Sequence, residues 1–256
     1  MPYSAPYWDE QYMLSENVLS PEILAFGDSW LHYPFNNLAS EIHAQLGQSY
    51  AMLVAGDSGQ EAQDWINKKR FAAQAKKYVH YYAPTAKAII LSAGGNDFAG
   101  LDDFDPLLRD DCSGIASAPG CFESKQPELL FQTVYAAYEW LIGLVREQNA
   151  TVPIFVHNYD YAQPSGQGLF GYGHWLKEPM DTAKVPRGLH AEVVRYLIDS
   201  FTSVIQGLEA EDNNIHLVKT AGTLTGNDWA NELHPRPAAF RKLGAKHVAE
   251  IKRFVV

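Results

Sequence analysis

Five short apolar runs, each followed by a segment with helical periodicity, constrain the fold of this 256-residue chain more than any other feature. The runs cover residues 23–26, 50–54, 88–92, 152–156 and 215–218. Continuous apolar runs of this length are typical of strands that are buried on both faces. No linker rich in proline or serine separates them. The alternation therefore predicts a single α/β domain over residues 1–256, with a parallel sheet and helices on both faces.

The remaining segments divide into expected helices and expected loops. Helices are predicted at about 37–46, 60–82, 127–145, 186–209 and 237–254. Residues 1–20 are expected to form an irregular arm, because Pro2, Pro6 and Pro21 interrupt any regular element. Two long loops are predicted at 98–126 and 162–185, and loops of this length in compact domains are usually functional.

Both loops carry residues with more than one interpretation. Cys112 and Cys121, in the first loop, are either two reduced thiols or one local disulfide, and their spacing lacks the second pair that a metal site needs. Aromatic residues in and before the second loop could line an acyl site, stack on sugar rings, or pack the loop onto the body. They are Tyr159, Tyr161, Phe170, Tyr172 and Trp175.

Composition excludes several classes of partner. The apolar content of 46% and the charged content of 20% are typical of soluble globular proteins. A net charge of −10 disfavours nucleic acid and anionic membrane surfaces as main partners. The chain has no apolar run of about 20 residues that could span a membrane, and its start lacks the features of a signal peptide. We therefore expect a cytoplasmic protein, although a mature secreted form fits the same sequence.

Polar or glycine residues follow four of the five predicted strands. They are Ser29, Gly56, Asn96 and His234. The carboxyl ends of parallel strands share one edge of a sheet, so these residues are expected to converge there. A serine activated by a histidine can attack an ester carbonyl. The backbone N–H groups of Ser29 and Gly56 and the Asn96 amide could then stabilise the oxyanion.

The short motifs around these residues resemble those of the SGNH or GDSL-type hydrolases. Gly27-Asp28-Ser29 is similar to the nucleophile block of that family, and Gly56 to its glycine block. Gly94-Gly95-Asn96-Asp97 and His234-Pro235 are similar to its asparagine and histidine blocks. The resemblance implies a flavodoxin-like three-layer fold with five parallel strands in the order 2-1-3-4-5. It also implies esterase, lipase or carbohydrate-deacetylase activity on a small ester, lipid or acylated glycan, without a cofactor or metal.

The sequence departs from the family at the catalytic acid. Many members carry Asp three residues before the histidine, where this chain has Asn231. Asp228 is our first choice for a replacement carboxylate and Glu232 the second, while a serine–histidine dyad needs neither. Gly59 is an alternative to Gly56 as the oxyanion glycine.

Other functions fit the same residues less well. Ser29 alone could be a helix cap, Asn96 a turn residue and His234 a loop residue. A non-catalytic module that binds a glycan or lipid would explain Asn231, but it would not require Ser29, Asn96 and His234 together. An acyltransferase differs from a hydrolase only in the acceptor. The sequence therefore predicts a serine ester hydrolase with Ser29 as nucleophile and His234 as base.

Overall fold

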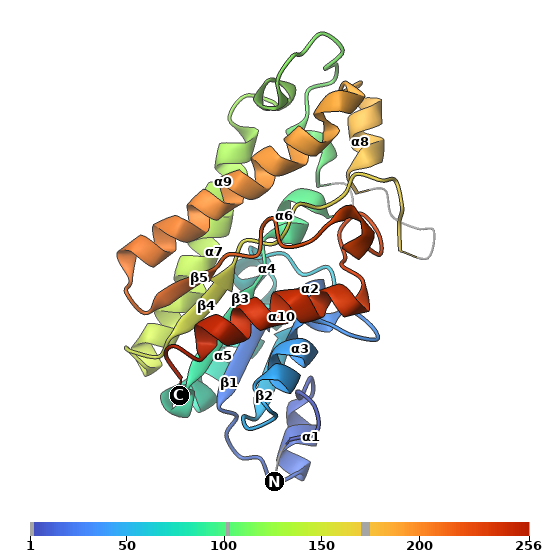
Figure 1. The fold of residues 1–256 in the computed structure, drawn as a ribbon. Helices are drawn as coiled ribbons and strands as arrows, with labels where there is room; N and C mark the ends of the chain where they lie inside the picture. Colours follow the sequence, from blue (N-terminus) through green and yellow to red (C-terminus); the bar gives the residue numbers. More distant parts are fainter. Residues whose placement is uncertain (1–2, 101–102, 170–174, 256) are drawn as a thin grey trace.

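A five-stranded parallel sheet forms the centre of the molecule (Figure 1). The computed structural model describes residues 3–100, 103–169 and 175–255. Its strands are β1 (Ile23–Gly27), β2 (Met52–Gly56), β3 (Ala88–Ser92), β4 (Ile154–His157) and β5 (Ile215–Val218). They are ordered β2-β1-β3-β4-β5, and every neighbouring pair is parallel. This order confirms the fold that the sequence resemblance implies.

The strands are buried almost completely, which explains why they appear in the sequence as mainly apolar runs. All residues of β1, β3, β4 and β5 are buried, and in β2 only Gly56 is partly exposed. Polar residues at strand ends, such as Ser92 and His157, are therefore held inside the protein and need internal hydrogen-bond partners.

Helices cover both faces of the sheet, as predicted. On one face α3 (Leu38–Gln45) packs against α10 (Pro237–Ile251). On the other, α7 (Gln126–Gln148) lies between α5 (Lys69–Tyr82) and α9 (His190–Glu211). Right-handed crossovers between parallel strands account for this division. In Figure 1, α7 and α9 extend beyond the strands toward the edge where the long loops lie.

The structure differs from the sequence prediction in two segments: the N-terminal arm is more regular than expected, and the helix expected at 60–82 is divided. The N-terminal arm contains α1 (Glu10–Ser15), whose cap is the Asp9 side chain, and Tyr7 forms a parallel bridge to Leu53 at the edge of the sheet. The helix expected at 60–82 is two helices, α4 (Asp64–Asn67) and α5. The Ala62 and Gln63 N–H groups donate to the Asp97 carboxylate ahead of α4, and Lys68, in an extended conformation, separates α4 from α5.

The long loops hold short helices, and both cysteines are unpaired. The first loop follows α6 (Gly95–Ala99) and contains 3₁₀ turns at Asp105–Leu107 and Ala118–Cys121, and the second contains α8 (Lys177–Thr182). Cys112 and Cys121 are buried free thiols, and burial raises the pKa of Cys121 to about 11. Among the described residues, no helix is long and apolar enough to cross a membrane.

Candidate active site

The turn after β1 presents Ser29 at the carboxyl edge of the sheet. Asp28 is the N-cap of α2 (Ser29–His32), and its carboxylate accepts the Trp30 N–H at 3.0 Å. A Cβ on Gly27 would lie 2.1 Å from the Ser92 carbonyl oxygen, so only glycine allows β1 and β3 to approach this closely. Ser29 thus becomes the first residue of a helix that starts directly at the end of a central strand.

Ser29, His234 and Asn231 form one hydrogen-bonded chain. The Ser29 hydroxyl lies 2.8 Å from His234 Nε2, and His234 Nδ1 lies 3.0 Å from the Asn231 amide oxygen. That oxygen also accepts the backbone N–H groups of His234 and Leu233, at 2.8 and 3.0 Å. An amide oxygen only accepts, so Nδ1 carries the proton and Nε2 is free to accept the Ser29 proton. The structure therefore brings together these three residues from the predicted set.

Aromatic rings enclose the imidazole. Tyr33 stacks on His234 with centroids 4.5 Å apart and planes 16° apart, and Trp175 lies edge-on at 6.1 Å. The Trp30 indole N–H donates to the Leu233 carbonyl at 3.2 Å and so holds the histidine loop to α2. Burial lowers the pKa of His234 to about 4, because an imidazolium is poorly solvated there. His234 is consequently a neutral base at physiological pH.

The structure does not place Asp228 at His234, although it was our first choice for the acid. Its carboxylate binds the Lys242 ammonium at 2.8 Å and caps the turn at Gly226–Asp228 through Thr225. The Lys242 ammonium holds the pKa of Asp228 at about 2. Asn231, three residues later in the chain, lies beside the imidazole instead.

Glu232, our second choice for the catalytic acid, binds backbone N–H groups of the long loop instead. Its side chain is fully buried and its carboxylate accepts four backbone N–H groups at 2.9 to 3.2 Å. The donors are Gly166, Trp175, Leu176 and Lys177. One carboxylate thereby joins two parts of the loop at 162–185 to the chain beside His234. It also fixes Trp175 at the imidazole.

We expect Glu232→Gln to lower the free energy of unfolding by about 2–3 kcal/mol. The glutamine amide nitrogen would face two of the four N–H donors, and a buried donor without an acceptor costs about 1–3 kcal/mol. Urea denaturation measures the change. Glu192→Gln on the exposed side of α9 is the matched control, and we expect it to stay within about 0.5 kcal/mol of wild type. Equal stabilities for the two variants would contradict this role of Glu232.

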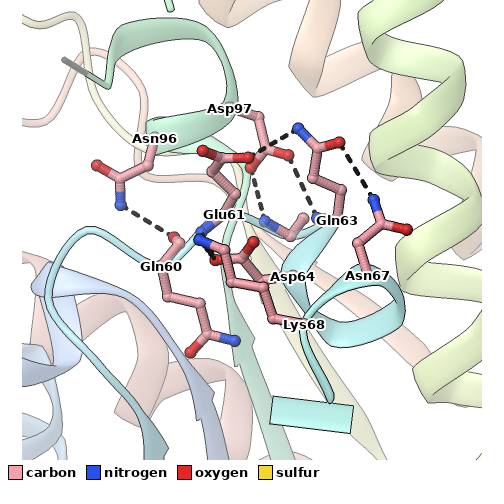
Figure 2. Close-up of polar contacts among 9 residues, drawn as sticks. Gln60, Glu61, Gln63, Asp64, Asn67, Lys68, Asn96 and Asp97 are labelled. Carbon is pink, nitrogen blue, oxygen red and sulfur yellow. Dashed lines mark hydrogen bonds and ion pairs between the residues drawn. The ribbon is translucent and has the colours of Figure 1, made fainter. Parts of the chain in front are cut away.

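Asn96 is held with its amide toward the turn after β2 (Figure 2). Its Nδ2 donates to the Gln60 carbonyl oxygen at 3.0 Å, while the Gln60 side chain points away. An amide nitrogen carries two protons, so the second N–H remains available for an oxyanion beside Ser29. The neighbouring Asp97 accepts the N–H groups of Ala62 and Gln63, and burial raises its pKa to about 7. Asp97 therefore supports the turn that positions Asn96.

The two candidate oxyanion glycines differ in their surroundings. Gly56 has φ +123°, and a Cβ there would lie 1.9 Å from the Gly27 carbonyl oxygen. Gly59 has φ +78°, open space where a Cβ would be, and a place in the wall of the cleft that contains Ser29. Close packing against β1 is therefore sufficient to explain why position 56 is glycine, without any role in catalysis. The oxyanion role of Gly56 remains a prediction, with Gly59 as its alternative.

A buried polar network behind Ser29 was not predicted. The Tyr159 hydroxyl donates to Asp28, whose other oxygen lies 3.4 Å from the Ser92 hydroxyl. His157 Nε2 lies 2.8 Å from the same hydroxyl. Burial raises the pKa of Asp28 to about 6 and lowers that of His157 well below its ordinary value. The signal in the sequence was the polar run that follows β4, at the same edge as Ser29.

The aromatic residues singled out in and before the second loop lie in different surroundings. Trp175 lies edge-on to His234, Tyr159 belongs to the buried network, and Tyr161 donates to Asp199 at the surface. Phe170 and Tyr172 lie outside the described residues. No group of three or more histidine, cysteine, aspartate or glutamate side chains in the described part of the chain could hold a metal ion.

Comparison with known proteins identifies the fold. No family model and no curated protein sequence matches the chain. Solved structures do match, including the lipase Lip_vut3 from a goat rumen metagenome, with 15% identity, a TM-score of 0.54, and coverage of 90% of this chain and 96% of that one. The chain has the fold of the SGNH/GDSL hydrolases.

Two further structures extend this likeness. A Clostridium thermocellum family 3 carbohydrate esterase has 12% identity and a TM-score of 0.53, with coverage of 93% of this chain and 100% of that one. A protein described as a GDSL-like lipase from Parabacteroides merdae has 13% identity and a TM-score of 0.55, with coverage of 91% and 95%. These similarities extend over most of each chain, so the SGNH-type fold accounts for nearly all of this one. At such identities they establish the fold and not the reaction.

Proposed function

We propose that this chain is a serine hydrolase that cleaves carboxylic esters through an acyl-enzyme intermediate. The observation that carries the proposal is the hydrogen-bonded chain from Ser29 through His234 to Asn231. A solvent-exposed serine elsewhere would be a poor nucleophile, whereas a neutral histidine at 2.8 Å can accept its proton during attack. The SGNH-type fold and its esterase and lipase neighbours support the same class of reaction.

The reaction proceeds in two displacements. Ser29 Oγ attacks the carbonyl carbon while its proton passes to His234 Nε2, and the carbonyl oxygen becomes an oxyanion. The free N–H of Asn96 and the backbone N–H of Ser29 are the proposed donors to that oxyanion, with Gly56 or Gly59 as a third. The intermediate then collapses, and the alkoxide leaves with the proton from Nε2.

Water completes the cycle. His234 takes a proton from a water molecule, which attacks the acyl-enzyme carbonyl. Collapse of the second intermediate releases the carboxylic acid and returns the proton to Ser29. Throughout, the Asn231 oxygen keeps the proton on Nδ1 and so preserves the tautomer that the base requires. It supplies no negative charge to the imidazolium.

Labelling with a fluorophosphonate tests the nucleophile directly. We expect one adduct per chain, located on Ser29 by peptide mass spectrometry, and turnover of at least one ester in a p-nitrophenyl series. Ser58→Ala, which removes another hydroxyl from the same cleft, should still be labelled, whereas Ser29→Ala should not. Labelling elsewhere, or no labelling and no turnover, would contradict the proposal. Binding of a glycan or lipid without labelling would favour the non-catalytic alternative, and ester formation with added alcohols an acyltransferase.

A further inference from the structure

Two spaces of different character meet at Ser29. Ser29, Asn96 and Leu233 line both of them. One, the apolar cavity, is the narrower space, and the other, the cleft, is wider and has Ser58, Glu61 and His234 in its walls. An ester carbonyl placed between Ser29 and Asn96 must therefore direct its acyl group into one space and its alcohol into the other.

The position of His234 determines which of the two spaces receives the alcohol of the ester and which receives its acyl group. In the described part of the chain, His234 lines the cleft and not the apolar cavity. The alkoxide must receive its proton from His234 Nε2 when the intermediate collapses, so the alcohol has to lie on the side of the histidine. The acyl chain is then directed into the apolar cavity.

The walls of the cavity match an apolar chain. They include Phe98 of α6, Leu176 of the long loop, and Val194, Leu197 and Ile198 of α9. The α9 residues lie at spacings of three and four, so they present one continuous apolar face. Two carboxylates also border the cavity, but Asp28 binds the Trp30 N–H and the Tyr159 hydroxyl, and Asp160 binds backbone N–H groups of 222–224. A polar acyl group would lose its hydration there without new partners.

We propose that this cavity binds the acyl chain, and that the preferred substrates are esters of apolar acids longer than acetate. The inference rests on the proposed function and adds its acyl specificity. An acetyl group would leave most of the α9 face uncovered, whereas each further methylene removes apolar surface from water. Each added methylene that enters the cavity is expected to raise kcat/KM about fourfold.

A p-nitrophenyl ester series from acetate through butyrate and hexanoate to octanoate tests the proposal, because the leaving group stays constant. We expect kcat/KM to rise by at least about tenfold from acetate to its maximum. Val194→Phe should fill part of the cavity and move the maximum to a shorter chain. Leu197→Ala should enlarge the cavity and move the maximum to a longer chain, which provides a second reading if the phenylalanine variant folds poorly.

Val204→Phe is the matched control. It makes the same substitution on the same helix, about 15 Å further along, where Val204 lines a surface groove against α7. Its chain-length profile should equal that of wild type. Highest kcat/KM on acetate, or an unchanged maximum in both cavity variants, would overturn the inference while leaving the proposed hydrolase intact. Absence of turnover on every ester, together with absence of labelling at Ser29, would instead overturn the proposed function and the inference with it.

Discussion

Ser29→Ala and His234→Ala are each expected to lower kcat/KM for p-nitrophenyl esters by at least about 10⁴-fold. The two side chains act as one unit, because the serine is a useful nucleophile only while Nε2 accepts its proton at 2.8 Å. Removing either member of such a unit costs nearly as much as removing both. The double variant should therefore be no more impaired than the single variants, within about threefold.

Steady-state kinetics on the three variants, with Ser58→Ala as control, measures this prediction. Ser58 lines the same cleft, and its loss should change kcat/KM by less than about threefold. The melting temperature of Ser29→Ala should stay within about 3 °C of wild type, because a single hydroxyl contributes little to packing. Losses that multiply in the double variant would show that Ser29 and His234 act independently, and would contradict the proposed mechanism.

The strands, and the placement of three candidate site residues at one edge of the sheet, were predictable because each depends on local sequence. A strand buried on both faces needs a continuous apolar run, and β3 was predicted with its observed limits. Ser29, Asn96 and His234 each follow such a strand within short recognisable motifs. A parallel sheet then brings its carboxyl ends to one edge whatever the connecting segments contain.

The role of each acidic residue was not predictable, because it depends on partners distant in sequence. Asp228 is held away from His234 by Lys242, 14 residues later on α10. Glu232 is satisfied by N–H groups 55 to 66 residues earlier in the chain. No pattern near either residue indicates these contacts. Likewise, the network of Asp28, Tyr159 and His157 forms only when β1 and β4 occupy the same sheet.

Burial of His234 beside the uncharged Asn231 is expected to set the acid limit of activity, and a charged residue at position 231 should raise that limit. Burial lowers the pKa of His234 to about 4, and the neutral imidazole is the form that acts as base. In wild type, kcat/KM should therefore hold nearly constant down to about pH 5 and fall tenfold per pH unit below pH 4.

Asn231→Asp places a carboxylate where the amide oxygen lies 3.0 Å from Nδ1. An adjacent opposite charge favours the imidazolium and raises a histidine pKa by about 1–3 units. The acid limit of the variant should consequently rise to between about pH 5 and pH 7, with activity retained at pH 8.

Removal of the acceptor has a different effect from the addition of charge. Asn231→Leu leaves Nδ1 without its partner and also frees the N–H groups of Leu233 and His234, so the histidine loses its defined tautomer and orientation. We expect kcat to fall by about 10²- to 10³-fold at every pH, which is less than the roughly 10⁴-fold loss that a wrong tautomer causes in a serine protease. Profiles of kcat/KM from pH 3.5 to 9 separate the two variants.

Asp228→Ala is the control, because the Asp228 carboxylate binds Lys242 and not the imidazole. The pH profile of this variant should match wild type within about twofold. An acid limit that moves in Asp228→Ala and stays fixed in Asn231→Asp would mean that Asp228 is the carboxylate coupled to His234 during catalysis.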